Sequence, residues 1–221
     1  MKTLAIDTSS HFCSVAVFDN DALVMSETKE IPRLHNVHLL NMIDALLSNT
    51  SLDKREIQKL AYGVGPGSFV GVRLAAAVMQ GFSLALDLPV RGFSSMALAA
   101  MYYIKERGFN KISVLLDAKM GDAYIGNYIY DIRADQLMFF EEKCIEEHLV
   151  SEAVNAFKPE IIVGESFGLE KHYQVEKALF DCKYAAPLFK DDALDSLSDQ
   201  LSDNAMPVYL QGTKKWKKLS S

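Results

Sequence analysis

The stretch from Tyr62 to Gly81, "YGVGPGSFVGVRLAAAVMQG", joins a glycine-rich loop to a nearly uncharged helix. A glycine loop that opens a helix is typical of phosphate sites, because the first backbone N–H groups of the helix point outward. The specific nucleotide motifs are absent: Val72 follows Gly71 where a Walker loop has lysine, and the glycine spacing misses G-x-G-x-x-G by one residue. The stretch therefore predicts either a tight turn that brings the helix close to a sheet, which the spacing favours, or a generic anion site.

The helix from Val72 to Leu86 is apolar around more of its circumference than contact with one sheet requires. Its polar residues Arg73, Gln80 and Ser83 lie at helical spacing and form one narrow stripe. A helix that packs on a single sheet needs an apolar face of only about 100°. We therefore expect a second cover over this helix, which can be a neighbouring helix, another lobe of the protein or another chain.

Two similar units follow one another along the chain, each with a β-hairpin, a helix and a further strand. When the second hairpin is laid over the first, Asp117 falls on Asp7 and Ile125 falls on Val15. Two divergent copies of one unit predict an α/β fold of two lobes, each with its own sheet and helices.

Composition limits the classes of protein to which the chain can belong. The 221 residues carry a net charge of −6, and an acidic chain gains little from phosphate contacts, so it is a poor nucleic-acid binder by itself. The basic segment Lys214–Lys218, "KKWKK", is a local exception that is more typical of a solvated tail than of an RNA contact. No apolar run reaches the roughly 18 residues of a membrane span. The three cysteines, Cys13, Cys144 and Cys182, are widely spaced, so we expect a cytoplasmic protein without disulfides.

Two pairs of residues are candidates for chemistry. Asp7 and Asp117 could face each other around a magnesium nucleotide, but the turn after Asp7 lacks glycine and the turn after Asp117 contains the bulky Met120. His35 and His38 lie three residues apart on one helical face, and two histidines alone do not complete a metal site. We therefore predict no catalytic residue and no metal in this chain, and we assign the histidines to a helix cap and an exposed surface.

Several segments of the chain are similar to one protein family. They are "LAIDTSSHFCSVAVF", "AYGVGPGSFVGVR", "VMQGFSLAL", "LLDAKMGDAYIGNY" and "PVYLQGTKKWKKL". In these segments the chain closely resembles the bacterial TsaB family of tRNA threonylcarbamoyladenosine biosynthesis proteins, densely over about 1–130 and 206–219 and thinly over about 131–200. Val70 departs from the family, which usually has threonine there, and loss of that hydroxyl weakens a phosphate role for the loop.

The resemblance implies a fold and a role. The fold is the two-lobed α/β fold of actin-like and Hsp70-like ATPases, with 1–105 and a returning segment of about 192–221 in the first lobe and 106–191 in the second. Members of the family are non-catalytic partners of TsaD, a metal-bearing subunit that moves a threonylcarbamoyl group from its adenylate to the adenosine beside the tRNA anticodon, and TsaE, a small ATPase, joins them. The resemblance therefore implies an accessory subunit that forms a heterodimer with TsaD, reaches tRNA only through the complex and forms a homodimer when alone.

The resemblance also implies a set of site residues. The family pairs through helices of the first lobe, so the expected partner interface consists of apolar residues on two of them: Leu39, Met42, Ile43, Leu46, Val72, Ala75, Ala76 and Met79. The glycine loop is then an inherited nucleotide or anion loop that positions an interface helix, with these residues: Asp7, Thr8, Gly65, Gly67 and Ser68. The chain itself is expected to require no cofactor, and ATP or ADP is expected only at the junction of the subunits.

Two other functions use the same fold. A small-molecule kinase or ATPase would bind Mg-ATP at Asp7, Asp117 and the glycine turns. A metallopeptidase would need a metal at His35 and His38, near the place where TsaD-like chains carry an HxxxH metal pair. The poor phosphate turns and the incomplete ligand set argue against both, so the accessory subunit is the predicted function.

Overall fold

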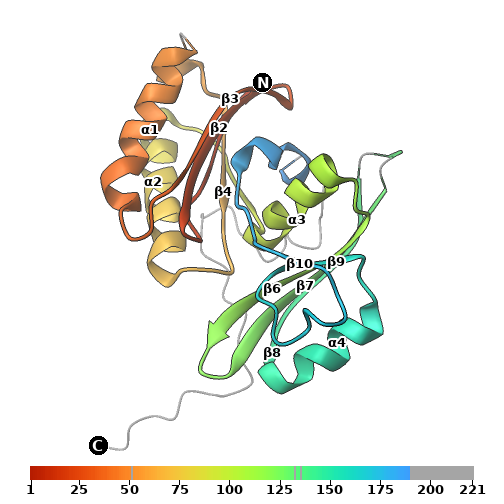
Figure 1. Cartoon of the computed structure of the whole chain (residues 1–221). Helices are drawn as coiled ribbons and strands as arrows, with labels where there is room; N and C mark the ends of the chain where they lie inside the picture. The colour runs from red at the N-terminus through yellow and green to blue at the C-terminus, as the bar shows by residue number, and fades with distance from the viewer. Residues whose placement is uncertain (51, 132, 135, 190–221) are drawn as a thin grey trace, which may run out of the picture.

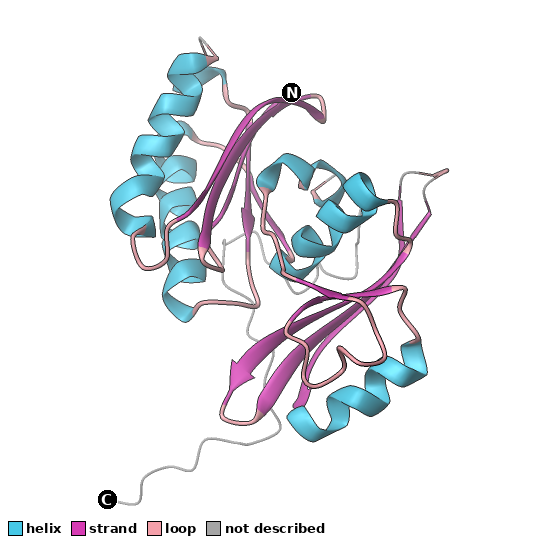
Figure 2. Ribbon diagram, viewed as in Figure 1, coloured by secondary structure: helices cyan, strands magenta, loops and turns pink. Residues whose placement is uncertain are grey.

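The computed structural model describes residues 1–50, 52–131, 133–134 and 136–189 (Figure 1). Two five-stranded sheets divide these residues into two lobes (Figure 2). The first sheet has the order β3-β2-β1-β4-β5, with β1 at Lys2–Asp7, β2 at Phe12–Asp19, β3 at Ala22–Glu30, β4 at Lys59–Gly63 and β5 at Val90–Phe93. The second sheet has the order β10-β9-β6-β7-β8, with β6 at Lys111–Lys119, β7 at Asp122–Asp131, β8 at Gln136–Glu146, β9 at Ile161–Gly164 and β10 at Val175–Glu176.

The two sheets share one topology. In the first sheet, β1 pairs antiparallel with β2 and parallel with β4, and in the second sheet β6 pairs antiparallel with β7 and parallel with β9. In both, the third strand of the unit pairs antiparallel with the second and lies at one edge. The duplicated two-lobed fold predicted from the sequence is confirmed, and the third strand of each unit is an addition to the predicted hairpin.

The helices form layers around the sheets (Figure 1). The first two, α1 at His35–Asn49 and α2 at Phe69–Leu86, pack on one face of the first sheet. The third, α3 at Ser95–Arg107, is packed in the core between the two sheets, and α4 at Val150–Phe157 packs on the far face of the second sheet. Four short 3-10 turns complete the described chain: η1 at Lys54–Glu56, η2 at Glu147–Leu149, η3 at Cys182–Tyr184 and η4 at Ala186–Leu188.

Alternating residues of β1 serve two different cores, because successive side chains of a strand point to opposite faces. Leu4 and Ile6 pack in the cluster that holds α1 and α2, whereas Ala5 packs in the cluster that holds α3. Ala61 of β4, opposite Ala5, lies in the same inner cluster. The small side chains on this inner face let α3 lie close to the first sheet while it also contacts the second.

Residues that favour helix ends stand at both limits of α3. Ser94 precedes the helix, and its Oγ accepts a hydrogen bond from the N–H of Ala97 at 3.1 Å. Gly108 ends the helix with φ of +74°, a conformation that glycine adopts without strain. Ser94 caps the helix, and the side chain of the next residue, Ser95, is left for a contact described below.

The chain returns to the first lobe before the predicted boundary at 191. The N–H of Cys182 donates to Ser14 Oγ at 2.7 Å, and the ring of Phe189 meets Phe18 edge-on at 5.5 Å between centroids. Lys59 Nζ donates to the carbonyl oxygen of Phe189 at 2.9 Å. The end of the predicted second lobe therefore packs on the first sheet, while the returning segment 192–221 lies outside the described residues, as does the basic segment within it.

Truncation of a core leucine tests the importance of the core between the lobes. Leu98 of α3 is fully buried there, so Leu98→Ala should lower the free energy of unfolding by about 2–5 kcal/mol through lost burial and the cavity left behind. Leu84 of α2 is 90% exposed, so the matched control Leu84→Ala should change it by less than about 0.5 kcal/mol. Urea unfolding followed by circular dichroism measures both changes, and equal effects would contradict this placement of α3.

Candidate functional site

Asp7 ends β1, and its carboxylate is fully buried at the junction of several elements. Its Oδ1 accepts from the N–H of Ser9 at 2.9 Å and from Ser9 Oγ at 2.8 Å. Its Oδ2 accepts from Ser95 Oγ at 2.6 Å. Burial raises the pKa of Asp7 above its ordinary value, although these three hydrogen bonds oppose the rise. The carboxylate predicted to face a nucleotide is thus satisfied by groups of its own chain.

Glycines at the end of β4 and in the first turn of α2 allow the backbone to approach this carboxylate and the turn that follows it. A Cβ at Gly63 would lie 1.8 Å from Asp7 Oδ2, and a Cβ at Gly71 would lie 1.9 Å from the carbonyl oxygen of Thr8. Thr8 Oγ1 also donates to the carbonyl oxygen of Gly71 at 2.7 Å. These glycines are therefore needed for close packing of α2 and β4 against the turn after β1.

Hydrogen bonds within the chain engage the N–H groups of the same loop. The N–H of Ser68 donates to the carbonyl oxygen of Ser9 at 2.6 Å, and the N–H of Gly65 donates to Ser95 Oγ at 3.2 Å. At Gly67, a Cβ would lie 2.3 Å from the carbonyl oxygen of Ser9. The structure thus brings the predicted loop residues together. A carbonyl oxygen of the chain lies beside the loop, however, and an anion would need hydrogen-bond donors at that place. This geometry favours the tight turn over the anion site.

Asp7 and Asp117, the candidate pair of carboxylates, lie on different kinds of face in the two sheets. Along β6, Val114 joins the core between the lobes and Leu115 joins the core under α4, so alternation places Asp117 with Leu115 on the far face. Asp7 lies on the same face of β1 as Ala5, and that face is directed toward the core between the lobes. The Asp117 carboxylate accepts from the backbone N–H and the Nζ of Lys119, which holds the pKa of Asp117 below its ordinary value.

The two histidines considered as metal ligands, His35 and His38, both lie near the start of α1. His35 begins α1 and is buried, with its Nε2 at 3.0 Å from the carbonyl oxygen of Phe12. His38 is half-buried one turn further along the helix. Within the described ranges, no three His, Cys, Asp or Glu side chains are grouped as a metal would require. Among the described residues, the structure gives His35 and His38 no third ligand of these types.

The residues predicted to contact a partner lie inside the first lobe. All eight are at most 4% exposed, and those of α1 pack with Ala75, Ala76 and Met79 of α2 in the core on the first sheet. Val72 is equally buried. The helical spacing of these apolar residues therefore identifies the stripe with which each helix packs on the first sheet. A partner that met these helices would contact the opposite stripes. Burial within the lobe therefore argues against the predicted contact residues, while the two helices remain candidates.

The opposite stripe of α2 is exposed and largely apolar. We call it the α2 ridge, and it consists of Phe69, Val70, Ala77, Gly81, Leu84 and Ala85. Phe69 is 64% exposed, Val70 is 73% exposed and Leu84 is 90% exposed. Arg73 lies on the same side, with its guanidinium 3.2 Å from the centre of the Phe69 ring. Val37 and Leu40 add exposed apolar area on α1.

By length and composition alone, α2 could cross a membrane, and 28% of it is buried. It nevertheless packs on the first sheet as one layer of a lobe, and its first turn is tied to the turn after β1. The sequence predicted that a second element would cover the outer side of α2. In the part of the chain that the structure describes, no element covers that side. An exposed apolar stripe of this kind is typical of a surface that another protein covers.

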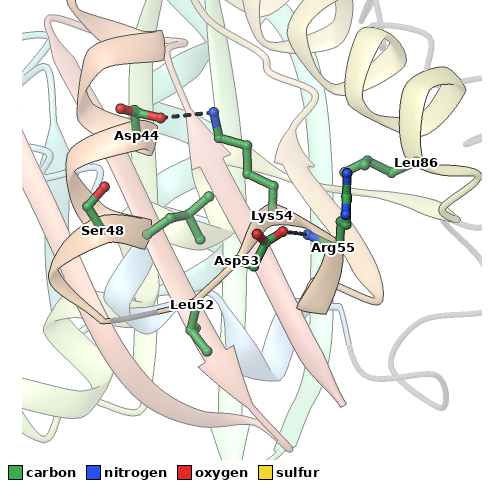
Figure 3. Close-up of a pocket in the computed structure, with 8 residues that line it drawn as sticks. Asp44, Ser48, Leu52, Asp53, Lys54, Arg55 and Leu86 are labelled. Atoms are coloured by element: carbon green, nitrogen blue, oxygen red, sulfur yellow. Dashed lines mark hydrogen bonds and ion pairs between the residues drawn. The ribbon is translucent and has the colours of Figure 1, made fainter.

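A shallow pocket lies at the opposite end of α2 from the glycine loop (Figure 3). It has a volume of about 540 Å³, and its lining comes from α1, η1 and the end of α2. Its charged groups are held by local contacts: Lys54 pairs with Asp44 at 2.8 Å, and Asp53 accepts from the N–H of Arg55 at 2.8 Å. An 18-residue helix is about 27 Å long, so this pocket is separate from Asp7.

These features define a class of protein, a two-lobed α/β protein of actin-like ATPase architecture whose glycine loop is docked on its own sheet. The family model described as TsaD, tRNA N6-adenosine threonylcarbamoyltransferase, matches residues 28–167, which is more than half of the chain. The tRNA threonylcarbamoyladenosine biosynthesis protein TsaB of Escherichia coli K12 is 30% identical over 99% of this chain and 98% of that protein. TsaB of Haemophilus influenzae is 30% identical over 99% of this chain and 97% of that protein.

A solved structure gives the same result. YeaZ from Pseudomonas aeruginosa is 28% identical, with a TM-score of 0.77 over 95% of this chain and 99% of that chain. The chain therefore belongs to the TsaB family.

Sequence reasoning missed two side chains that organise this region. Ser95 binds Asp7, and Glu142 of β8 binds Ser94 across the lobes. A serine pair before a helix is a detectable signal for a cap, but it does not identify a carboxylate partner. Glu142 lies in a strand with several other acids and has no local feature that distinguishes it.

Two glycines of α2 offer a matched test of the docked loop. Gly71→Ala should destabilise the protein by more than about 1 kcal/mol, because the new Cβ would overlap the Thr8 backbone, which cannot rotate away. Gly81→Ala meets nothing within 4 Å and should stabilise it by about 0.5–1 kcal/mol through helix propensity. Thermal unfolding measures the change in stability of both variants. A Gly71→Ala variant as stable as the unchanged chain would contradict the close approach.

Proposed function

We propose that this chain is a non-catalytic accessory subunit of tRNA threonylcarbamoyladenosine biosynthesis that binds a TsaD-like transferase through the α2 ridge. The observation that carries the proposal is the exposed apolar ridge of α2. The opposite stripe of this helix is already buried in the core on the first sheet, so the ridge is left for another protein. Membership of the TsaB family supports the process, since its relatives are named for that biosynthesis. The docked glycine loop supports an accessory role, because the N–H groups of Gly65 and Ser68 are engaged within the chain.

The ridge suits helix-to-helix contact. Ala77, Gly81 and Ala85 recur every four residues, so they lie above one another on one face of α2. Their small side chains let a second helix approach closely, while Phe69 and Leu84 provide apolar area at either end of the helix. Such a surface has the apolar centre that stable interfaces require.

The remaining parts of the proposal concern the assembly. The TsaD-like subunit supplies the metal and the transfer chemistry, and a TsaE-like ATPase completes the cytoplasmic complex. tRNA is held by the assembly rather than by this acidic chain. ATP or ADP binds at the junction between subunits, and a second copy of this chain occupies the ridge when the partner is missing.

Charge placed on the ridge should break the complex without unfolding the chain. Leu84→Glu and Gly81→Glu add a carboxylate at exposed positions, so each should weaken binding to the TsaD-like subunit by about tenfold to hundredfold. Size-exclusion chromatography with light scattering and titration calorimetry measure the complex. Unchanged circular dichroism and melting temperature establish that the variants are folded.

Met138→Glu is the matched control, because Met138 is an apolar residue of β8 that is 60% exposed in the other lobe. It should leave the affinity within about twofold of the unchanged chain, as rim and remote positions do. Retained binding by both ridge variants, or equal loss in Met138→Glu, would contradict the assignment of the interface to α2.

A small-molecule kinase or ATPase is the competing function on this architecture. It requires Mg-ATP to reach Asp7, which is fully buried and bonded to Ser9 and Ser95. We expect the isolated chain to show no ATP turnover that depends on Asp7. Phosphate release measured for the unchanged chain and for Asp7→Asn tests this, and turnover that falls in the variant would establish the ATPase instead.

A further inference from the structure

A partly buried hydrogen-bonded cluster joins the two lobes at the start of α3. Glu142 of β8 accepts a short hydrogen bond from Ser94 Oγ, which precedes α3 in the first lobe. The same oxygen of Glu142 accepts from the hydroxyl of Tyr128 on β7 at 2.6 Å. Gly126 lies directly opposite Glu142, and a Cβ there would be 2.5 Å from the Tyr128 hydroxyl. The absence of a side chain at Gly126 therefore makes room for the Tyr128 hydroxyl that reaches Glu142.

The cluster is tied to the first turn of α3. Ser94 Oγ donates to Glu142 and also accepts the N–H of Ala97 at 3.1 Å, so one hydroxyl both caps the helix and holds the second lobe. The next residue, Ser95, donates to Asp7 of the first sheet. Two successive serines thus bind one carboxyl group from each lobe, and both contacts meet at the beginning of the helix between the sheets.

We propose that Ser94, Tyr128 and Glu142 form an inter-lobe latch that is closed while Glu142 carries a proton and loosens when Glu142 ionises. A protonated carboxyl satisfies the two hydroxyl groups without placing a charge between the lobes. An ionised carboxylate at this partly buried place loses hydration, so ionisation favours an arrangement in which β8 lies further from the start of α3 and more water reaches the carboxylate.

The surroundings of Glu142 support this behaviour. Burial raises the pKa of Glu142 above its ordinary value, and the hydrogen bonds from Ser94 and Tyr128 only oppose that rise. The pKa of Tyr128 is well above its usual range, through burial and the nearby Glu142, so the phenol stays neutral. Other titratable groups near the cluster are Tyr124 and Cys144 on the same face of β7 and β8, and Asp7 at the adjacent serine. The pKa values of all three are raised, mainly by burial.

The direction of the pH effect follows from linkage. A carboxyl group whose pKa is raised by folding binds a proton more readily in the folded chain than in the unfolded chain. Its contribution to stability is fully present below the pKa of the unfolded chain, and it is lost as pH rises through the higher pKa of the folded chain. The latch is therefore closed in mildly acidic solution and loosens as the pH increases.

Glu142→Gln tests the latch, because glutamine keeps an acceptor for Ser94 and Tyr128 and cannot ionise. We expect the melting temperature of the unchanged chain to fall relative to Glu142→Gln between pH 5 and 8. In hydrogen exchange, corrected for the intrinsic effect of pH, the first-turn amides of α3 should open about tenfold more readily for each unit by which the pH exceeds the pKa of Glu142. In Glu142→Gln the same amides should keep a constant protection.

Glu141→Gln is the matched control, since Glu141 is the adjacent, exposed acid and pairs with Lys143 at 3.2 Å. It should follow the pH profile of the unchanged chain. Tyr128→Phe provides an independent test that keeps Glu142: it removes a hydrogen bond that lowers the pKa of Glu142, so the midpoint of the profile should move to higher pH. A Glu142→Gln profile that matches the unchanged chain, or a midpoint unmoved in Tyr128→Phe, would overturn the proposal.

Discussion

The close approach of the glycine loop to the turn after β1 is the constraint on which the first lobe depends. Gly63 and Gly71 have no room for a Cβ, since the Asp7 carboxylate and the Thr8 carbonyl occupy that space. Ser95 binds Asp7 and the N–H of Gly65, so the same contact fixes the start of α3. Once these backbones are in contact, the directions of α2 on the outer face and of α3 on the inner face are both set.

The two lobes share a topology but have diverged where a nucleotide would meet them. In the first lobe, Asp7 faces the core between the sheets, whereas Asp117 in the second lobe lies on the far face and pairs with Lys119. A shift of one residue along a strand moves a side chain to the other face of the sheet, so a sequence alignment of the hairpins can match two acids that do not face each other. The acid of the second lobe that contacts the start of α3 is Glu142, which comes from β8.

These observations connect the fold to an accessory role. The loop that would hold phosphates is used to dock α2, and the outer stripe of α2 is left as an apolar surface. The start of α3 links that docked loop to the second lobe through adjacent serines. The proposed partner would contact α2, and the proposed latch acts on the start of α3. Hydrogen bonds through the glycine loop connect these two helices, which gives a physical route between the lobes and the docking surface.

The sequence by itself determined the duplicated α/β architecture and favoured the tight turn over the anion site, because strand pattern and glycine positions are local features. It did not determine which stripe of α1 and α2 is exposed: periodicity identifies an apolar face such as that of Leu39 and Met79, and only the sheet shows that this face is already covered. Nor could it join Ser94 to Glu142, which are 48 residues apart and meet only when the lobes pack. Contacts of that kind follow from the tertiary structure, since they depend on how two separate sheets enclose one helix.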